Sequence, residues 1–158
     1  MLAKIKPYVI SVLISLAVGG FSALLTMGNM DIYSEVYTPA LSPPGFLFPI
    51  VWTVLYTLMG ISAAIIYGKR EEYPSQVRHA LTVYAFSLFV NFFWSIIFFN
   101  MRSFLFAFVW LLLLWYLILK TIMLYKQISP VAAYLQIPYL IWVTFAGYLN
   151  LGIFLLNM

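Results

Sequence analysis

Five long apolar runs dominate this sequence and limit what it can fold into. A helix needs about 20 mainly apolar residues to cross a bilayer, and all five runs meet that requirement. Backbone groups in lipid must form their hydrogen bonds within the segment, so each run is predicted to be a helix and not a strand. The predicted spans are residues 8–27, 47–68, 80–99, 104–125 and 131–156.

The small number of charged residues also indicates that the chain is surrounded by lipid. Only 8% of the 158 residues are charged, whereas 65% are hydrophobic and 20% are aromatic. A soluble domain carries about 25% charged residues, and a soluble chain this short could not hide so much apolar surface from water. We therefore predict an all-α membrane protein, with residues 1–158 forming a single bundle of five transmembrane helices. The alternative for the first run is a signal peptide, but it is long for one, and its removal would leave an even number of spans.

The basic residues predict an orientation, because Lys and Arg are enriched in cytoplasmic connections. One side of the predicted bundle carries only Arg102. The other side carries seven basic residues: Lys4, Lys6, Lys69, Arg70, Arg78, Lys120 and Lys126. We therefore expect a multi-pass protein of the cell membrane whose N-terminus is cytoplasmic and whose C-terminus and first connection lie outside.

The first connection, residues 28–46, is the long one, and it reads "GNMDIYSEVYTPALSPPGF". Loops of this length without structure are usually functional or disordered. Its aromatic residues and prolines favour an ordered cap over the outer face. Pro44 belongs to the stiff end of this loop, and Pro49 falls in the first turn of the second helix, where a missing N–H costs little.

Several kinds of chemistry find no support in the sequence. The predicted spans contain no Asp, Glu or Arg, which argues against an ion-coupled pump. The chain has no Cys and one His, His79, which is typical of an interfacial residue; we therefore predict no metal site. No serine has an evident base beside it, and no acid–base pair is evident. The net charge is +4, but the few basic residues lie at the ends of the apolar runs, where they anchor helices. We therefore predict no nucleic-acid partner.

Polar and indole side chains gather in the outer half of the predicted bundle. Asn91 lies about eight residues, or about 12 Å, from the outer end of its helix. Asn150, Trp52 and Trp94 lie about five or six residues from the outer ends of theirs, and Trp142 lies deeper. This distribution predicts a pocket beneath the long first loop.

Helical spacing supports such a pocket. Asn91 and Ser95 share a face of the third predicted helix, and Trp52 and Tyr56 share a face of the second. The fifth helix carries a stripe that contains Tyr139, Trp142, Ala146 and Leu149, with Phe145 beside it. A pocket lined by aromatic residues and a few polar groups suits a large, flat, mostly apolar ligand.

Other roles are open for some of these residues. Trp52 and Trp94 could be interfacial anchors, as Trp near a span end often is. Trp110 and Trp115 are predicted to face lipid or to pack between helices. The two asparagines could clamp neighbouring helices together, and we favour this role for Asn150.

Small residues recur every four positions on the first two predicted helices and predict close helix contacts. Such stripes serve contacts within a bundle at least as often as contacts in a dimer, so they are compatible with a homodimer without requiring one. The residues are Ser15, Gly19 and Ala23 on the first helix and Gly60, Ala64 and Gly68 on the second.

Three motifs closely resemble the TspO/MBR family, whose members are called translocator protein, peripheral benzodiazepine receptor or tryptophan-rich sensory protein. They are "PALSPPGFLFPIVWTVLYTLMG", "VNFFWSIIFF" and "PYLIWVTFAGYLN", in this order along the chain. The resemblance covers essentially the whole chain and favours a bacterial member. It implies a five-helix bundle that needs no cofactor and binds tetrapyrroles such as protoporphyrin IX. It also implies that isoquinoline-carboxamide and benzodiazepine drugs bind in the same pocket.

The resemblance assigns roles to individual residues. Matching motif positions indicate Trp52, Asn91, Trp94, Trp142 and Ala146 as pocket residues. Bacterial members are associated with light-dependent breakdown of the bound porphyrin, for which Trp52 and Trp142 are the candidates here. Together with helical spacing, the resemblance predicts a ligand-binding set of Pro44, Trp52, Tyr56, Asn91, Trp94, Ser95, Trp142, Phe145, Ala146 and Leu149.

The chain departs from the family pattern at three positions. Ile32 stands where the family often has Trp, Thr38 where it often has Lys, and Ser87 where it often has Gln. The sequence after Tyr148 contains no basic residue, so the sterol motif of animal members is not carried over.

Two functions from different classes follow as expectations. The first is a tetrapyrrole-binding receptor or sensor, with at most a light- and oxygen-dependent degradation of its ligand. The alternative is a transporter of porphyrins or lipids. Transport has less support in the residues, because the sequence has no ionisable relay and no detectable inverted repeat.

Overall fold

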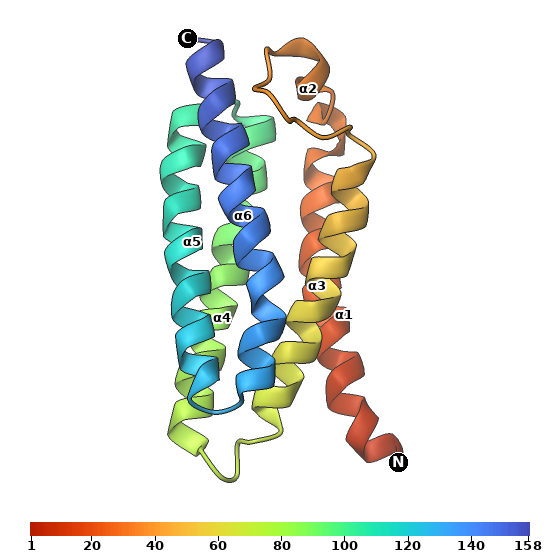
Figure 1. Cartoon of the computed structure of the whole chain (residues 1–158). Helices are drawn as coiled ribbons and strands as arrows, with labels where there is room; N and C mark the ends of the chain where they lie inside the picture. Colours follow the sequence, from red (N-terminus) through yellow and green to blue (C-terminus); the bar gives the residue numbers. More distant parts are fainter.

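The computed structural model describes all 158 residues, and every regular element in it is a helix (Figure 1). Five helices are long and apolar enough to cross a membrane, which confirms the predicted fold class. The long helices are α1 (Leu2–Thr26), α3 (Leu47–Tyr67), α4 (Pro74–Ser95), α5 (Phe104–Lys126) and α6 (Pro130–Leu156). The short elements are the 3₁₀ turn η1 (Met27–Asn29), the helix α2 (Ile32–Glu35) and the π-helical turn η2 (Ile96–Asn100).

Two helices begin earlier than the sequence predicted. α1 starts at Leu2 and not near residue 8, and α4 starts at Pro74 and not near residue 80. Hydropathy marks the apolar part of a helix, but a helix can continue with polar residues beyond that part. Pro74 supplies the start of α4, because proline is favoured in the first helical turn.

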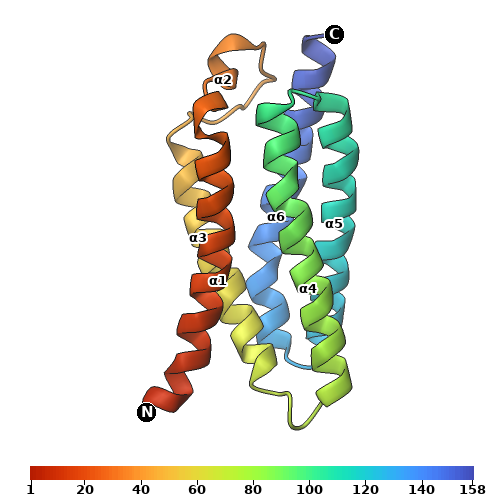
Figure 2. The same cartoon turned by 180° about the vertical axis from the view of Figure 1, so that it is seen from behind.

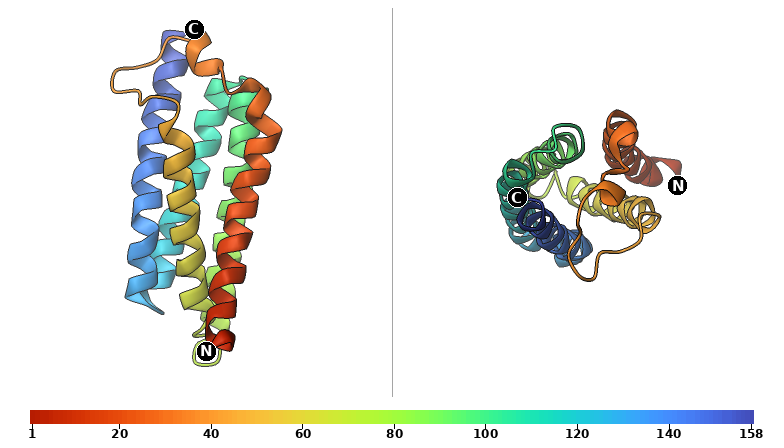
Figure 3. Two further views of the ribbon diagram at one scale, coloured as in Figure 1. Left: turned by 90° about the vertical axis from the view of Figure 1, so that its right-hand side faces the viewer. Right: turned by 90° about the horizontal axis from the view of Figure 1, so that it is seen from above.

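The long helices run antiparallel to their neighbours along the chain (Figures 1 and 2). The C-terminus and the segment around α2 lie at one end of the bundle, and the N-terminus lies at the other. We call these the lid end and the amino-terminal end, and we call residues 27–46 the lid. Seen from above, the lid crosses from α1 over the end of the bundle to α3 (Figure 3).

α1 and α3 approach closely because small residues lie between them. A Cβ atom on Gly60 would lie 2.5 Å from the Cα atom of Val12, and one on Gly19 would overlap the ring of Tyr56. The hydroxyl of Ser15 donates a hydrogen bond of 2.6 Å to the carbonyl oxygen of Tyr56. Ser15, Gly19 and Gly60 of the predicted stripes therefore serve a contact within the bundle.

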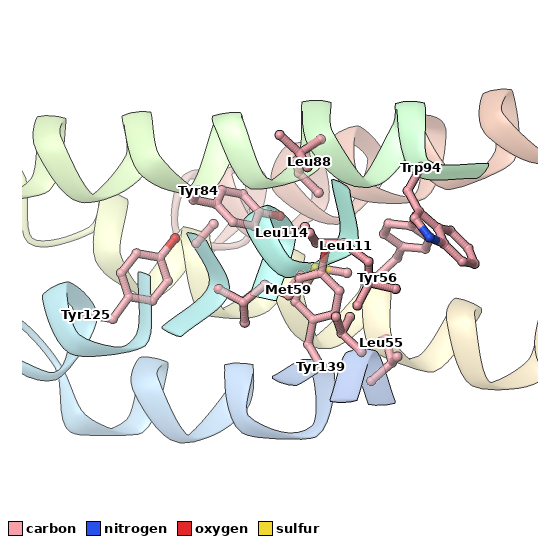
Figure 4. Packing of buried hydrophobic residues seen from close by; sticks show 14 of the residues in the cluster. Leu55, Tyr56, Met59, Tyr84, Leu88, Trp94, Leu111, Leu114, Tyr125 and Tyr139 are labelled. Atoms are coloured by element: carbon pink, nitrogen blue, oxygen red, sulfur yellow. The ribbon is translucent and has the colours of Figure 1, made fainter. Parts of the chain in front are cut away.

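Large side chains fill the centre of the bundle towards the amino-terminal end. Figure 4 shows this packing between Trp94 at the lid end and Tyr125 at the other. Met59, Leu114 and Tyr139 are at most 1% exposed. The core between α3, α5 and α6 is therefore tightly packed at these residues.

Candidate ligand-binding cavity

A cavity of about 230 Å³ lies beneath the lid. Its walls come from α1, α3, α4, η2 and α6, and lid residues including Tyr33 and Gly45 form its roof. α5 contributes no lining residue. The lining residues are Gly19, Ser22, Ala23, Thr26, Met30, Tyr33, Gly45, Phe48, Pro49, Trp52, Tyr56, Asn91, Trp94, Ser95, Phe98, Phe99, Trp142, Ala146, Leu149 and Asn150.

Aromatic rings form much of the cavity wall and contact one another. The ring centroids of Trp52 and Tyr56 lie 5.5 Å apart, and those of Phe48 and Trp142 lie 5.8 Å apart at an edge-on angle. Tyr33 of the lid stacks on Phe48 at 5.2 Å, so the roof is joined to the wall. Contacting aromatic rings at these separations support each other's orientation, and they present flat apolar faces to the cavity.

Two amides connect the helices around the cavity. Asn91 of α4 donates from Nδ2 to the hydroxyl of Tyr56 on α3 at 3.0 Å. Asn150 of α6 accepts from the indole nitrogen of Trp94 at 3.1 Å and donates to the carbonyl oxygen of Phe104 at 2.8 Å. Asn150 therefore clamps α6 to α4 and α5, as favoured from the sequence, while also lining the cavity.

The lid is attached to α6 by hydrogen bonds. The Tyr148 hydroxyl donates to the carbonyl oxygen of Ala40 at 2.7 Å. Asn157 bonds both backbone groups of Tyr37, accepting from its N–H at 3.0 Å and donating to its carbonyl oxygen at 2.9 Å. The lid is thus an ordered cover, in agreement with the expectation from its aromatic residues and prolines.

An ion pair attaches the lid to a second place, the turn between η2 and α5. Arg102, the single basic residue at this end, lies 2.8 Å from the carboxylate of Glu35. Both side chains are about half exposed, so the pair orients the lid more than it stabilises the fold. Arg102 has a φ of 51°, a left-handed conformation that L residues seldom adopt.

The structure brings eight of the ten predicted ligand-binding residues together in the cavity wall: Trp52, Tyr56, Asn91, Trp94, Ser95, Trp142, Ala146 and Leu149. The other two lie outside the wall. Pro44 is exposed and precedes the roof residue Gly45. Phe145 packs beside Trp142, with ring centroids 5.6 Å apart, and not on the cavity. A role in ligand binding stays a prediction for all ten.

Sequence reasoning missed the contribution of α1 and of the segment after Trp94. The small residues of α1 were interpreted only as packing positions, yet Gly19 and Ala23 also line the cavity. Phe98 and Phe99 are placed there by the π-helical turn η2. Such turns are rare and shift the helical register, so regular helical spacing could not have located these two rings.

The three departures from the family pattern add no charge to the cavity. Ile32 belongs to the lid and is fully buried in the core, and Thr38 is exposed. Ser87 is buried, and its hydroxyl donates to the carbonyl oxygen of Tyr84 on its own helix at 2.6 Å. None of the three is among the lining residues.

Trp110 and Trp115 lie outside the cavity, as expected. The indole nitrogen of Trp110 donates to the carbonyl oxygen of Val90 at 2.7 Å and joins α5 to α4. The indole nitrogen of Trp115 donates to the hydroxyl of Thr144 at 2.8 Å on the exposed face of α5 and α6. Trp115 therefore provides a matched control for changes to the cavity tryptophans.

These features define an integral membrane protein: a five-helix bundle with an aromatic cavity closed by an ordered lid. The family model described as the TspO/MBR family matches residues 11–156. The chain therefore belongs to the TspO/MBR family.

Named relatives are similar over most of the chain. A tryptophan-rich protein TspO of Chlorobaculum tepidum is 38% identical over 125 residues, covering 79% of this chain and 78% of the relative. A TspO of Archaeoglobus fulgidus is 35% identical over 155 residues, covering 98% and 99%. The translocator protein of Bos taurus is 35% identical over 136 residues, covering 85% and 80%.

Proposed function

We propose that this protein is a membrane receptor or sensor that binds a tetrapyrrole, such as protoporphyrin IX, in the cavity beneath the lid. The observation that carries the proposal is the aromatic wall, in which Trp52, Trp94 and Trp142 line the same cavity. Flat aromatic ligands gain from stacked and edge-on contacts with such rings. Isoquinoline and benzodiazepine compounds share this flat, apolar character and are proposed as ligands of the same cavity.

The size and charge of the cavity suggest how a porphyrin would be oriented. The volume of about 230 Å³ is below the range of about 300–1,000 Å³ typical of ligand pockets. A macrocycle would therefore have to displace lid or wall side chains to enter fully. No lining residue is charged, so porphyrin carboxylates are expected to remain at the mouth, close to water, while the ring enters.

Quenching of intrinsic tryptophan fluorescence by protoporphyrin IX tests the proposal. Quenching should saturate at low micromolar porphyrin in detergent or lipid. Trp142→Phe removes one stacking surface, so the midpoint should rise about 3- to 10-fold, and Asn91→Ala should also raise it. Trp115→Phe should leave the midpoint unchanged, although it lowers the total signal. Absence of saturable quenching in both environments would refute tetrapyrrole binding.

Light-dependent degradation of the bound porphyrin is a second candidate activity. It is favoured by the presence of two tryptophans, Trp52 and Trp142, on the same cavity. The chemistry would come from the excited porphyrin and oxygen, with the protein orienting the ring and a tryptophan donating an electron. Absorbance of illuminated porphyrin, followed with and without protein, tests the activity. If Trp52→Phe and Trp142→Phe both react as fast as the unmodified protein, the electron-donor role is wrong.

Transport across the membrane is the alternative function. The residues that continue the cavity towards the amino-terminal end are tightly packed, with Met59 fully buried and Tyr139 only 1% exposed. Passage of a ligand would require these side chains to separate, which supports a receptor over a transporter. Porphyrin flux into proteoliposomes that exceeds the flux into protein-free vesicles would favour transport instead.

A further inference from the structure

A second groove lies at the amino-terminal end of the bundle, far from the lid. It has a volume of about 500 Å³ and is bounded by α1, α3 and α4. Its existence follows from the crossing of α1 and α3 at Val12 and Gly60. Beyond this close contact α1 diverges from the other helices towards the N-terminus (Figures 1 and 2). The groove is the space that opens between α1 and the helices α3 and α4 as α1 diverges from them.

The first half of α1 has little protein packed against it. No residue before Ser15 is buried on this helix, and Ile10 and Ile14, which line the groove, are about half exposed. The opposite wall includes the buried residues Ala63 and Ala64 of α3. These small side chains leave room for an apolar chain to lie along the groove.

Two cations stand at the mouth of this apolar groove. Lys6 of α1 and Arg70, which follows α3, both line it, and no acidic residue does. The two ion pairs of the structure involve neither residue. The Arg70 guanidinium lies 4.2 Å from the ring centroid of Tyr67 and donates to the Tyr67 carbonyl oxygen at 3.1 Å. These contacts orient the Arg70 side chain at the groove, and no carboxylate lies within ion-pair distance of its guanidinium.

A polar side chain lies in the groove below the cations. Ser11 lies five residues after Lys6 on α1, about 7 Å deeper along the helix, and lines the groove. Tyr84 forms part of the wall and is 7% exposed, but its hydroxyl oxygen is buried in protein and not accessible from the groove. Ser11 is therefore the polar side chain available to a molecule that lies along the groove.

We propose that the groove binds an anionic glycerophospholipid from the membrane leaflet at the amino-terminal end. Its phosphate would lie between Lys6 and Arg70, its ester groups at the depth of Ser11, and one acyl chain against Ala63 and Ala64. Cationic pockets between transmembrane helices favour acidic lipid head groups, and Arg and Lys both suit phosphate. The site is separate from the cavity beneath the lid and shares no residue with it.

Lipid binding to the delipidated full-length protein in detergent tests the proposal. Native mass spectrometry would compare phosphatidylglycerol with phosphatidylcholine of the same acyl chains. We expect preferential retention of phosphatidylglycerol. The double variant Lys6→Gln/Arg70→Gln should bind phosphatidylglycerol about 30-fold more weakly. This figure assumes that each of the two cations contributes about 1 kcal/mol to binding. Lys120→Gln/Lys126→Gln removes equal charge outside the groove and should change the affinity less than about twofold.

A second variant distinguishes the contribution of the groove to lipid binding from the contribution of the two cations. Ser11→Trp fills the groove while keeping Lys6 and Arg70, and it should weaken phosphatidylglycerol binding even if the double variant cannot be purified. An excess of inorganic phosphate should leave the lipid bound, because the acyl chain contributes to affinity. The proposal is overturned if both lipids bind equally, if the control variant loses as much affinity as the groove variant, if Ser11→Trp binds normally, or if phosphate alone displaces the lipid.

Discussion

The hydrogen bond between Asn91 and Tyr56 illustrates how single residues hold this bundle together. The two side chains are 2% and 7% exposed, and their atoms lie 3.0 Å apart at the floor of the cavity. In an apolar interior, an unpaired amide costs more than the bond itself contributes.

Because leaving Asn91 unpaired should cost more than the hydrogen bond contributes, Tyr56→Phe is predicted to destabilise the protein. The substitution keeps the ring but removes the acceptor of Asn91, so stability should fall by about 1–3 kcal/mol. Thermal unfolding in detergent measures the change, and Tyr116→Phe, at an exposed position of α5, serves as control. Combining Tyr56→Phe with Asn91→Leu should recover most of the loss, because both partners are then apolar. If Tyr56→Phe unfolds at the same temperature as Tyr116→Phe, the bond has no structural role.

At the scale of secondary-structure elements, the close contact between α1 and α3 depends on where small residues lie along the two helices. The same amino acid has opposite consequences at different positions of these two helices. Gly60 faces the backbone of Val12, whereas Gly20 has nothing within 4 Å of where a Cβ would stand. Backbone atoms cannot move aside as the end of a flexible side chain can, so the space at Gly60 is required by the helix crossing.

Alanine substitutions at the two glycines should therefore change stability in opposite directions. Gly20→Ala should stabilise by up to about 1 kcal/mol, since alanine is the better helix former. Gly60→Ala gains the same propensity but forces α1 and α3 apart, with a net loss of about 1–3 kcal/mol. Unfolding temperatures of the two variants in the same detergent test this. Equal shifts at the two positions would show that the helix contact tolerates a methyl group.

The sequence predicted the cavity residues that lie in regular helices, but it did not predict those contributed by η2 and by the lid. Trp52, Tyr56 and Trp142 were identified because they follow helical spacing within apolar runs, and the fold preserved that spacing. Phe98 was missed because η2 departs from the α-helical register. Tyr33 was missed because its position depends on the path of the lid, which is determined by long-range contacts such as the one between Glu35 and Arg102.

At the scale of the whole molecule, charge is distributed very unevenly between the two ends. The lid end carries Arg102 as its only basic residue, paired with Glu35. Every other Lys and Arg lies towards the amino-terminal end, where Lys6 and Arg70 border the groove proposed to bind lipid. Basic connections remain cytoplasmic during insertion, so this asymmetry predicts that the lid and the cavity mouth face the outside.

The absence of cysteine allows this orientation to be tested directly, because any introduced thiol is the only one in the chain. Ser34→Cys places an exposed thiol in the lid, and Gln76→Cys places one in the first turn of α4. A membrane-impermeant maleimide applied to intact cells should label the cysteine at position 34 and leave that at position 76 unlabelled. After the membrane is permeabilised, both should react, which shows that each thiol is accessible. The reverse pattern in intact cells would place the N-terminus outside and the cavity mouth in the cytoplasm, and the charge argument would then be wrong.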